Sequence, residues 1–139
     1  MDEHLLAAYR RTDYRVRLPG GGKACLHVDQ PLPVALHALV GASSWGFITA
    51  WHPASRPTPR EINRRAQRQL LAALRDAPST RGILPAIGVG VEGWREPSLF
   101  AIGTDIATLD CLAHEFGQLA FLAGDGPGMT VLRWTKRPA

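Results

Sequence analysis

His52 and Glu96 are the two side chains in this sequence best placed to transfer protons at neutral pH. His52 directly follows the apolar segment 47–51, and Glu96 stands shortly before a second apolar segment that begins at Leu99. An imidazole and a carboxylate form a minimal set for general acid–base catalysis when both reach one substrate. The pattern therefore predicts His52 and Glu96 as catalytic residues if the two segments are neighbouring strands. An ion pair between Glu96 and a surface arginine is the alternative interpretation.

Other polar side chains stand at similar positions, where an apolar segment ends or a helix begins or ends. Such positions commonly present ligand-binding groups, because loops at strand ends are exposed while the sheet holds them rigidly. We therefore expect a polar pocket at the rim of a sheet, and the nearby arginines favour an anionic small molecule. The alternative is that these side chains only cap turns and satisfy buried backbone groups. The expected ligand-binding residues are Thr49, Ser55, Arg56, Asn63, Arg64, Ser98 and Gln118.

Several short patterns match cofactor or catalytic motifs without the structural context that those motifs require. Residues 88–93 match G-x-G-x-x-G, but residues 94–97 (Trp-Arg-Glu-Pro) cannot continue as the helix that binds a pyrophosphate. Residues 20–23 lack the spacing of a phosphate-binding loop, and no serine lies in a G-x-S-x-G elbow. We therefore expect no cofactor.

Two Cys/His pairs, Cys25-x-His27 and Cys111-x-x-His114, offer four potential metal ligands. If the two pairs met, they would form a tetrahedral site of the kind that binds zinc. Their spacing matches no standard zinc module, however, and cysteine often packs as a small buried apolar residue. We therefore expect structural cysteines and no metal.

The chain is basic, with a net charge of +4, and the charge is concentrated in one segment. Between Arg56 and Arg81 there are seven arginines and two acidic residues. Arg60, Arg64 and Arg68 recur every fourth residue, which places them on one face of a predicted helix over 59–76. Such a stripe is able to follow nucleic-acid phosphates, although a solvated helix face has the same pattern. A nucleic-acid or protein interaction module using this helix is therefore an alternative function, but not the favoured one.

Length and composition predict a single domain over residues 1–139. The chain is 45% hydrophobic and 20% charged, which is ordinary for a globular protein with one core. No apolar run approaches the roughly 18 residues that a membrane span needs, and the acidic start of the chain does not resemble a secretory signal. Two cysteines far apart in sequence suggest no disulfide framework. We expect a cytoplasmic protein without membrane association, and its oligomeric state stays open.

The hydrophobic periodicity predicts an α+β fold in which a mixed sheet of about five to seven strands packs with three to four helices. The strand 45–51 should be central, because both of its faces are apolar. Thr58 and Glu61 should form a capping box at the start of the second long helix, and Gly117 should end the last helix in a left-handed conformation. Strands are expected over 14–18, 24–28, 45–51, 83–91, 99–102, 119–122 and 129–134, and helices over 3–11, 31–40, 59–76 and 104–116.

Four segments of the chain together resemble a bacterial family known as domain of unknown function 3293. They are residues 47–55 (Phe-Ile-Thr-Ala-Trp-His-Pro-Ala-Ser), 61–63 (Glu-Ile-Asn), 96–98 (Glu-Pro-Ser) and 116–120 (Phe-Gly-Gln-Leu-Ala). The resemblance extends from about Tyr9 to Val131 and implies a compact bacterial cytoplasmic domain, with no substrate, cofactor or partner attached to it. The family pattern usually has asparagine in place of His52, and often Glu-Glu-Asn in place of residues 61–63. The resemblance therefore does not support a catalytic role for His52.

Overall fold

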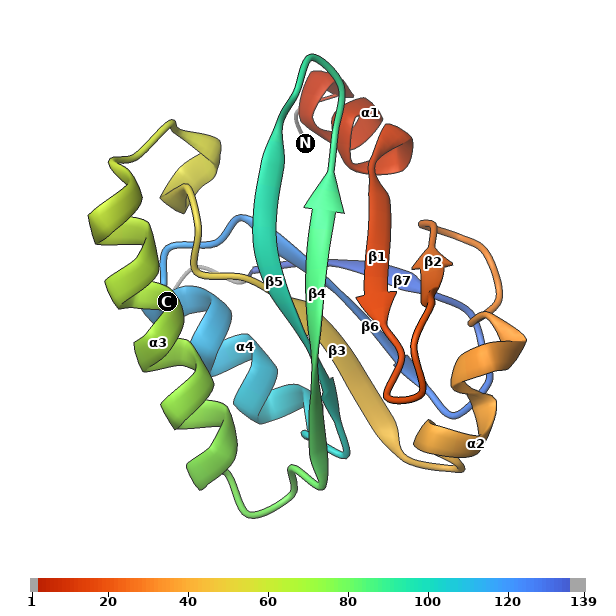
Figure 1. The fold of residues 1–139 in the computed structure, drawn as a ribbon. Coiled ribbons are helices and arrows are strands. Elements are labelled where there is room, and N and C mark those ends of the chain that lie inside the picture. Colours follow the sequence, from red (N-terminus) through yellow and green to blue (C-terminus); the bar gives the residue numbers. More distant parts are fainter. Residues whose placement is uncertain (1–2, 136–139) are drawn as a thin grey trace.

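The structure, a computed structural model, describes residues 3–135, and its seven strands form one sheet (Figure 1). The strands are β1 (Asp13–Arg17), β2 (Lys23–Leu26), β3 (Ser44–Ile48), β4 (Gly82–Val89), β5 (Arg95–Ile102), β6 (Ala120–Asp125) and β7 (Val131–Trp134). The helices are α1 (Glu3–Arg11), α2 (His37–Val40), α3 (Arg60–Asp76) and α4 (Ile106–Glu115), with 3-10 turns at Val34–Leu36 and Pro53–Ser55.

The strand order is β2-β1-β4-β5-β3-β6-β7, and every described pairing is antiparallel. The expected α+β class is confirmed, the sheet reaches the upper limit of seven strands, and β3 is the predicted central strand. The expected mixture of parallel and antiparallel pairs is not observed. Helix α3 connects β3 with β4, and α4 connects β5 with β6, and in each case one antiparallel strand lies between the two connected strands. This is the split β-α-β arrangement, in which strands of the same direction never pair.

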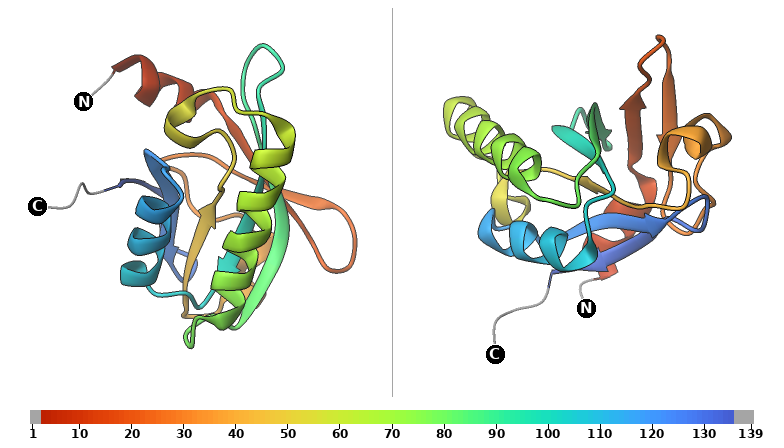
Figure 2. Two further views of the ribbon diagram at one scale, coloured as in Figure 1. Left: turned by 90° about the vertical axis from the view of Figure 1, so that its left-hand side faces the viewer. Right: turned by 90° about the horizontal axis from the view of Figure 1, so that it is seen from below.

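Helices α3 and α4 cover one face of the sheet (Figure 2). The sheet curls, so its other face packs against α1, α2 and the sheet's own β1–β2 hairpin. Alternation along β3 supplies both faces, as expected for a buried strand. Ile48 belongs to the core under α3 and α4, whereas Trp45 and Phe47 belong to the core on the other face. The apolar core is therefore divided into two layers, one on each face of the sheet.

A tight turn joins β4 and β5 at the end of the segment 88–93, whose sequence matches the dinucleotide motif. Glu92 and Gly93 both have positive φ, 56° and 76°, and the Trp94 N–H donates to the Val91 carbonyl over 3.1 Å. Two such residues between antiparallel strands form a type I′ hairpin turn. Because this turn is so short, β5 begins at Arg95, four residues before the predicted start of the strand.

The predicted helix boundaries are partly confirmed. Asp105 caps α4 by accepting from the Thr108 N–H over 2.8 Å, and Gly117 follows that helix with a φ of 67°. The capping box predicted for α3 is wrong, because Pro59 occupies the N-cap position and the Thr58 hydroxyl donates to the Arg56 carbonyl instead.

The helix predicted over 31–40 is reduced to a 3-10 turn followed by the single turn of α2. Pro31 forms an isolated bridge with Met129, and the Leu32 N–H donates to the Gly128 carbonyl. These contacts hold the start of the segment in an extended conformation, so helical structure begins only after Pro33.

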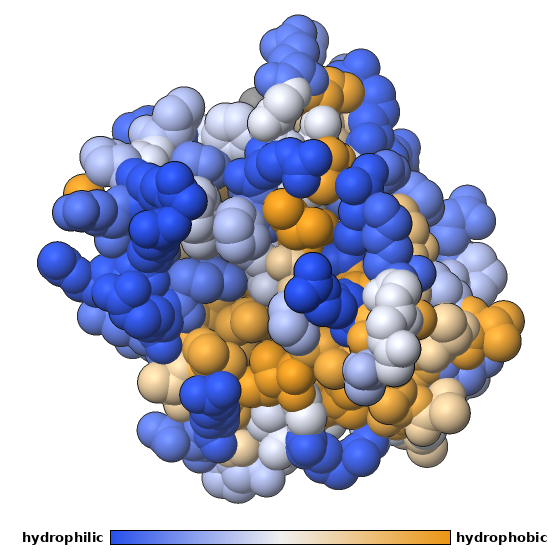
Figure 3. Space-filling model, in the orientation of Figure 1, coloured by the Kyte–Doolittle hydropathy of each residue, from blue (hydrophilic) through white to orange (hydrophobic). Residues whose placement is uncertain are grey.

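The surface over α3 is strongly hydrophilic, as expected from its arginines (Figure 3). Among the helices that the structure describes, none has the length and apolar character required to cross a membrane.

Candidate ligand-binding cavity

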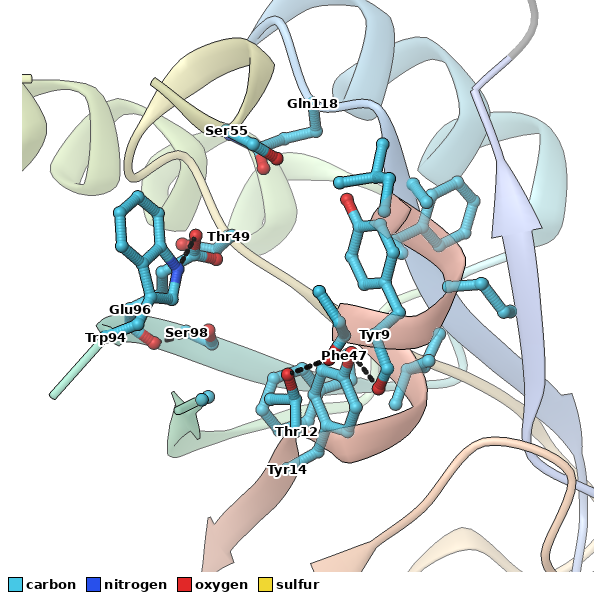
Figure 4. A pocket seen from close by; sticks show the side chains of 18 of the residues that line it. Tyr9, Thr12, Tyr14, Phe47, Thr49, Ser55, Trp94, Glu96, Ser98 and Gln118 are labelled. Atoms are coloured by element: carbon cyan, nitrogen blue, oxygen red, sulfur yellow. Dashed lines mark hydrogen bonds between the residues drawn. The ribbon is translucent and has the colours of Figure 1, made fainter. Parts of the chain in front are cut away.

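A cavity of about 310 Å³ lies on the face of the sheet opposite α3 and α4 (Figure 4). Its walls come from α1, from the ends of β1, β3 and β6, from β7, and from the β4–β5 hairpin. This volume lies at the lower end of the range found for small-molecule sites. Five of the predicted site residues line it, namely Thr49, Ser55, Glu96, Ser98 and Gln118.

Gly88 explains why there is space in this part of the sheet. It pairs with Tyr14 on one side and with Glu96 on the other, so these three residues share one face of neighbouring strands. A Cβ at Gly88 would lie 3.7 Å from the Thr12 methyl carbon, at ordinary contact distance. The missing side chain therefore leaves a hollow between the Tyr14 ring and the Glu96 carboxyl group.

Glu96 is the carboxyl group that lies deepest in the cavity. Burial raises its pKa from 4.5 to about 7, and the hydrogen bond from Trp94 opposes this rise. That bond joins Trp94 Nε1 to Glu96 Oε1 over 2.7 Å (Figure 4). Within residues 3–135, no hydrogen bond is found for the other carboxylate oxygen, Oε2. Glu96 therefore has a free acceptor in a mostly apolar environment.

Two tyrosines face Glu96 from α1 and β1. Burial, followed by the charge of Glu96, raises the pKa of Tyr9 to about 12. Burial also raises the pKa of Tyr14, whose hydroxyl donates to the Tyr9 carbonyl over 3.0 Å. Both phenols are therefore neutral at physiological pH, and the second one attaches the end of α1 to the sheet.

Thr49 and Ser98 line the cavity, but both are already hydrogen-bonded to the backbone. The Thr49 hydroxyl donates to the Pro97 carbonyl over 2.7 Å and accepts from the Trp51 N–H. The Ser98 hydroxyl donates to the carbonyl of Glu96 over 2.8 Å. The bond from Thr49 to Pro97 extends the contact between β3 and β5 beyond their last paired residues. Because both hydroxyl protons are already donated, each hydroxyl keeps only acceptor capacity for a ligand.

Ser55 and Gln118 reach the cavity from the loop after β3 and from the end of α4. The Gln118 side-chain amide donates to the Trp51 carbonyl over 3.1 Å, and the Ala54 N–H donates to the Gly117 carbonyl over 2.8 Å. These two bonds hold the 51–55 loop against the end of α4. They place Ser55, which has a φ of 58°, beside the hydroxyl of Tyr9.

His52 and Asn63 form a separate network that closes the loop between β3 and α3. The Asn63 side chain is buried; its oxygen accepts from the His52 N–H over 3.0 Å and its nitrogen donates to the Thr58 carbonyl over 2.9 Å. His52 Nδ1 in turn accepts from the Thr58 N–H over 3.1 Å. Neither residue lines the cavity, and this arrangement matches the structural interpretation of both.

Trp94 contacts both members of the predicted catalytic pair. Its indole ring lies 4.6 Å from the His52 ring, centroid to centroid, while its N–H binds Glu96. Burial lowers the pKa of His52, which favours the neutral ring. The structure therefore places the His52 ring against one part of the indole and only Glu96 in the cavity.

The arginines predicted to favour an anion lie elsewhere. Arg56 and Arg64 are exposed and do not line the cavity. Across the described part of the chain, neither they nor Arg60 and Arg68 form an ion pair within 4.0 Å. The arginine stripe of α3 is thus a solvated surface on the face of the sheet opposite the cavity.

The residues that the sequence analysis missed are Tyr9, Tyr14, Gly88 and Trp94. The dipeptide Glu92-Gly93 was a usable signal, because such pairs form two-residue hairpin turns. Recognising this turn would have joined the two strands and brought Gly88 and Trp94 close to Glu96, although a plain two-residue turn pairs Gly88 with Pro97 and the structure shifts this register by one residue, to Glu96. The contribution of α1 had no comparable signal, since the helix touches the cavity only through the tertiary fold.

One group of three potential metal ligands occurs in residues 3–135, namely Asp13, Cys25 and His27 on the outer face of β1 and β2. Cys111 and His114 of α4 are not part of it, and both cysteines are free thiols, with Cys111 exposed. His27 Nε2 lies 2.9 Å from Asp13 Oδ1, and this contact lowers the pKa of Asp13. The other Asp13 oxygen pairs with Arg15, so these partners account for the group as an ion-pair network.

Together, the fold and the site define an antiparallel α+β protein with an aromatic, carboxyl-containing cavity on one face of its sheet. The sequence profile of the family described as "Protein of unknown function (DUF3293)" matches residues 48–121. The chain belongs to this family. The match runs from the last residue of β3 to the start of β6, a shorter part of the chain than the resemblance from Tyr9 to Val131 suggested. No curated protein and no solved structure matches the chain significantly.

Proposed function

We propose that this protein binds a small organic molecule in the cavity between α1 and the sheet. The observation that carries the proposal is the combination of a partly open cavity of about 310 Å³ with aromatic walls and a buried carboxyl group. Sites for small molecules are typically of this kind, mostly apolar with a few polar groups that orient the ligand. The orienting groups here are Glu96, Ser55 and the acceptor oxygens of Thr49 and Ser98.

The cavity lining changes the expected charge of the ligand. Anion sites normally supply arginine, lysine or free backbone N–H groups. Among the described residues that line this cavity there is no arginine, lysine or histidine. A neutral or cationic ligand therefore fits this geometry better than the anionic one that the arginine-rich segment suggested.

A cavity-filling substitution tests the proposal. Gly88→Leu places a branched side chain between Tyr14 and Glu96, whereas Gly20→Leu adds the same side chain in open space at the β1–β2 turn. We expect fragments of a chemically mixed library to bind the wild-type chain and Gly20→Leu, but not Gly88→Leu, in ligand-observed NMR. Native mass spectrometry of gently purified protein should show the same difference for any co-purified molecule. If binding is absent, or unchanged in Gly88→Leu, the proposal fails.

An enzyme that uses Glu96 alone is a second candidate, and the pKa of about 7 favours it. A carboxyl group with such a pKa is suited to donate or accept a proton at neutral pH. Under this candidate, turnover of a bound molecule would follow an apparent pKa near 7 and would be lost in Glu96→Gln without loss of binding. A pH profile of turnover with no transition in this region would contradict it.

A further inference from the structure

The ionisable groups around the cavity give its interior a negative or neutral charge. Only four of the described lining residues titrate, namely Tyr9, Tyr14, Glu92 and Glu96, and the two tyrosines stay neutral. Glu92 is exposed at the hairpin turn, so Glu96 is the only buried source of charge among them. A ligand with positive charge would offset the cost of ionising this buried carboxyl group.

Glu96 presents a specific acceptor rather than a diffuse charge. Trp94 holds Oε1 with a hydrogen bond of 2.7 Å, which fixes the orientation of the carboxyl group. Among residues 3–135 no donor is found for Oε2, and the neighbouring position on β4 is Gly88, which has no side chain to fill the space. A donor group of a ligand can therefore approach this oxygen from inside the cavity.

Aromatic rings surround the same space on several sides. Tyr14 and Phe47 form an edge-to-face pair with centroids 5.2 Å apart, Trp94 closes the hairpin side, and Tyr9 covers the side of α1 (Figure 4). The faces of such rings attract cations through their quadrupoles. Their hydrocarbon parts also favour an apolar ligand body.

We propose that the cavity selects organic cations, that is, molecules that carry an ammonium or amidinium group on an aromatic or aliphatic body. This inference rests on the proposed function, because it names the class of ligand for the same site. The cationic N–H group donates to Glu96 Oε2, and the body packs among the rings of Tyr9, Tyr14 and Phe47. A carboxylate or phosphate ligand would meet the Glu96 charge and find no cationic partner in the described lining.

A set of three probes of nearly equal shape tests this selection in the full-length protein. They are 2-phenylethylamine, 2-phenylethanol and 3-phenylpropanoate, which carry an ammonium, a hydroxyl and a carboxylate on similar bodies. In NMR titrations at pH 8, we expect the amine to bind at least about tenfold more tightly than either of the other two. Its affinity should fall by about tenfold or more at pH 5.5, where Glu96 is protonated.

Two matched substitutions locate the selection. Glu96→Gln keeps an acceptor for Trp94 Nε1 but removes the charge, so the preference for the amine should disappear while 2-phenylethanol still binds. Glu92→Gln removes the exposed carboxylate at the rim and should leave the preference intact. Retained binding of the alcohol also shows that the Glu96→Gln variant is folded.

The outcomes separate this inference from the proposed function. If the alcohol or the carboxylate binds as tightly as the amine, or if Glu96→Gln keeps the preference, the inference is overturned and the binding cavity stands. If library fragments bind in a manner sensitive to Gly88→Leu but the amine does not bind, the inference is likewise overturned. If no molecule of any charge binds, both proposals fail.

Discussion

Burying the Glu96 carboxyl group lowers the free energy of unfolding by an amount that depends on pH. Its carboxyl group lies in the aromatic cavity with a pKa raised from 4.5 to about 7. In the unfolded chain it ionises near 4.5, so between about pH 4.5 and pH 7 the folded state holds more protons than the unfolded state. Stability must therefore fall as pH rises through this window, and stay at the lower level above it.

The Glu96→Gln variant should lose this pH-dependent penalty. Relative to wild type, we expect its free energy of unfolding to increase by about 2 kcal/mol between pH 5 and pH 8. Urea unfolding of both proteins at the two pH values measures the difference, and all other titrating groups cancel in the comparison. An equal pH dependence of the two proteins would show that Glu96 is solvated and titrates normally.

Asn63 and His52 show how residues of catalytic type can have structural roles. The buried Asn63 side chain binds the backbone of His52 and of Thr58, and His52 has a left-handed φ of 48°. Asparagine adopts this conformation more readily than most residues. The asparagine that the family resemblance implies at this position fits this backbone geometry, without any catalytic requirement.

Asn63→Ala should destabilise the protein strongly. The change leaves a buried N–H and a buried carbonyl without partners, which costs about 2–4 kcal/mol. His52→Asn should cost less than about 1 kcal/mol, because asparagine tolerates the left-handed backbone and keeps an acceptor for the Thr58 N–H. Thermal and urea unfolding measure both variants. Similar costs for the two substitutions would contradict the network described here.

At the scale of elements, helix α3 combines a well-predicted body with a poorly predicted start. Its apolar stripe includes Leu70 and Leu74, both fully buried, as the helical spacing indicated. The start was mispredicted because two capping signals competed. Thr58 is followed by Pro59, and the structure places the proline at the N-cap, where it precedes the first helical residue, Arg60.

The arginine stripe of α3 carries an avoidable cost to stability. Arg60, Arg64 and Arg68 are exposed at spacings of four residues, where like charges repel. Arg64→Glu converts both repulsive pairs into attractive ones but adds a repulsion with Glu61, three residues before it, so it should stabilise the protein by about 0.5 kcal/mol at low salt. Urea unfolding at low and high ionic strength measures this. The gain should shrink at high salt, and a salt-independent gain would indicate a cause other than charge. Arg64→Ala is the matched control, since it removes the repulsion only.

At the scale of the whole molecule, most elements were predictable and their arrangement was not. Every predicted strand exists and β3 is central, because alternation and apolar runs are local signals. Helices α3 and α4 each connect two strands that have one other strand between them, and these connections set the strand order. No local sequence pattern predicts such a connection. Thr49, Glu96, Ser98 and Gln118 could be selected from the sequence because a polar residue at the end of an element is also a local signal. The part of the cavity formed by Tyr9 and Tyr14 was not found, since it arises only when β1 pairs with β4.

The cavity joins elements that are distant in sequence, so an occupied site should stabilise them together. Helix α1 has no fully buried residue, but four residues at or just after it line the cavity; they are Leu5, Ala8, Tyr9 and Thr12. The contacts that hold the helix include the edge-to-face contact of Tyr9 with Trp134, the bond from Tyr14 to the Tyr9 carbonyl, and an exposed ion pair between Arg10 and Asp29. Elements with so few buried contacts open easily, and their amide hydrogens exchange quickly.

A bound ligand should therefore protect α1 from exchange more than it protects α3 and α4, which pack on the opposite face of the sheet. At a ligand concentration of about 100 times Kd, mass action stabilises the whole protein by about 2.7 kcal/mol. Local protection should be largest in α1 and in the β4–β5 hairpin, because both contribute walls of the cavity.

Hydrogen–deuterium exchange with mass spectrometry, with and without a saturating fragment from the library screen, measures this distribution. The Gly88→Leu variant at the same fragment concentration is the control and should show no added protection. Protection concentrated in α3 or α4 would place the binding site on the other face of the sheet and contradict the cavity.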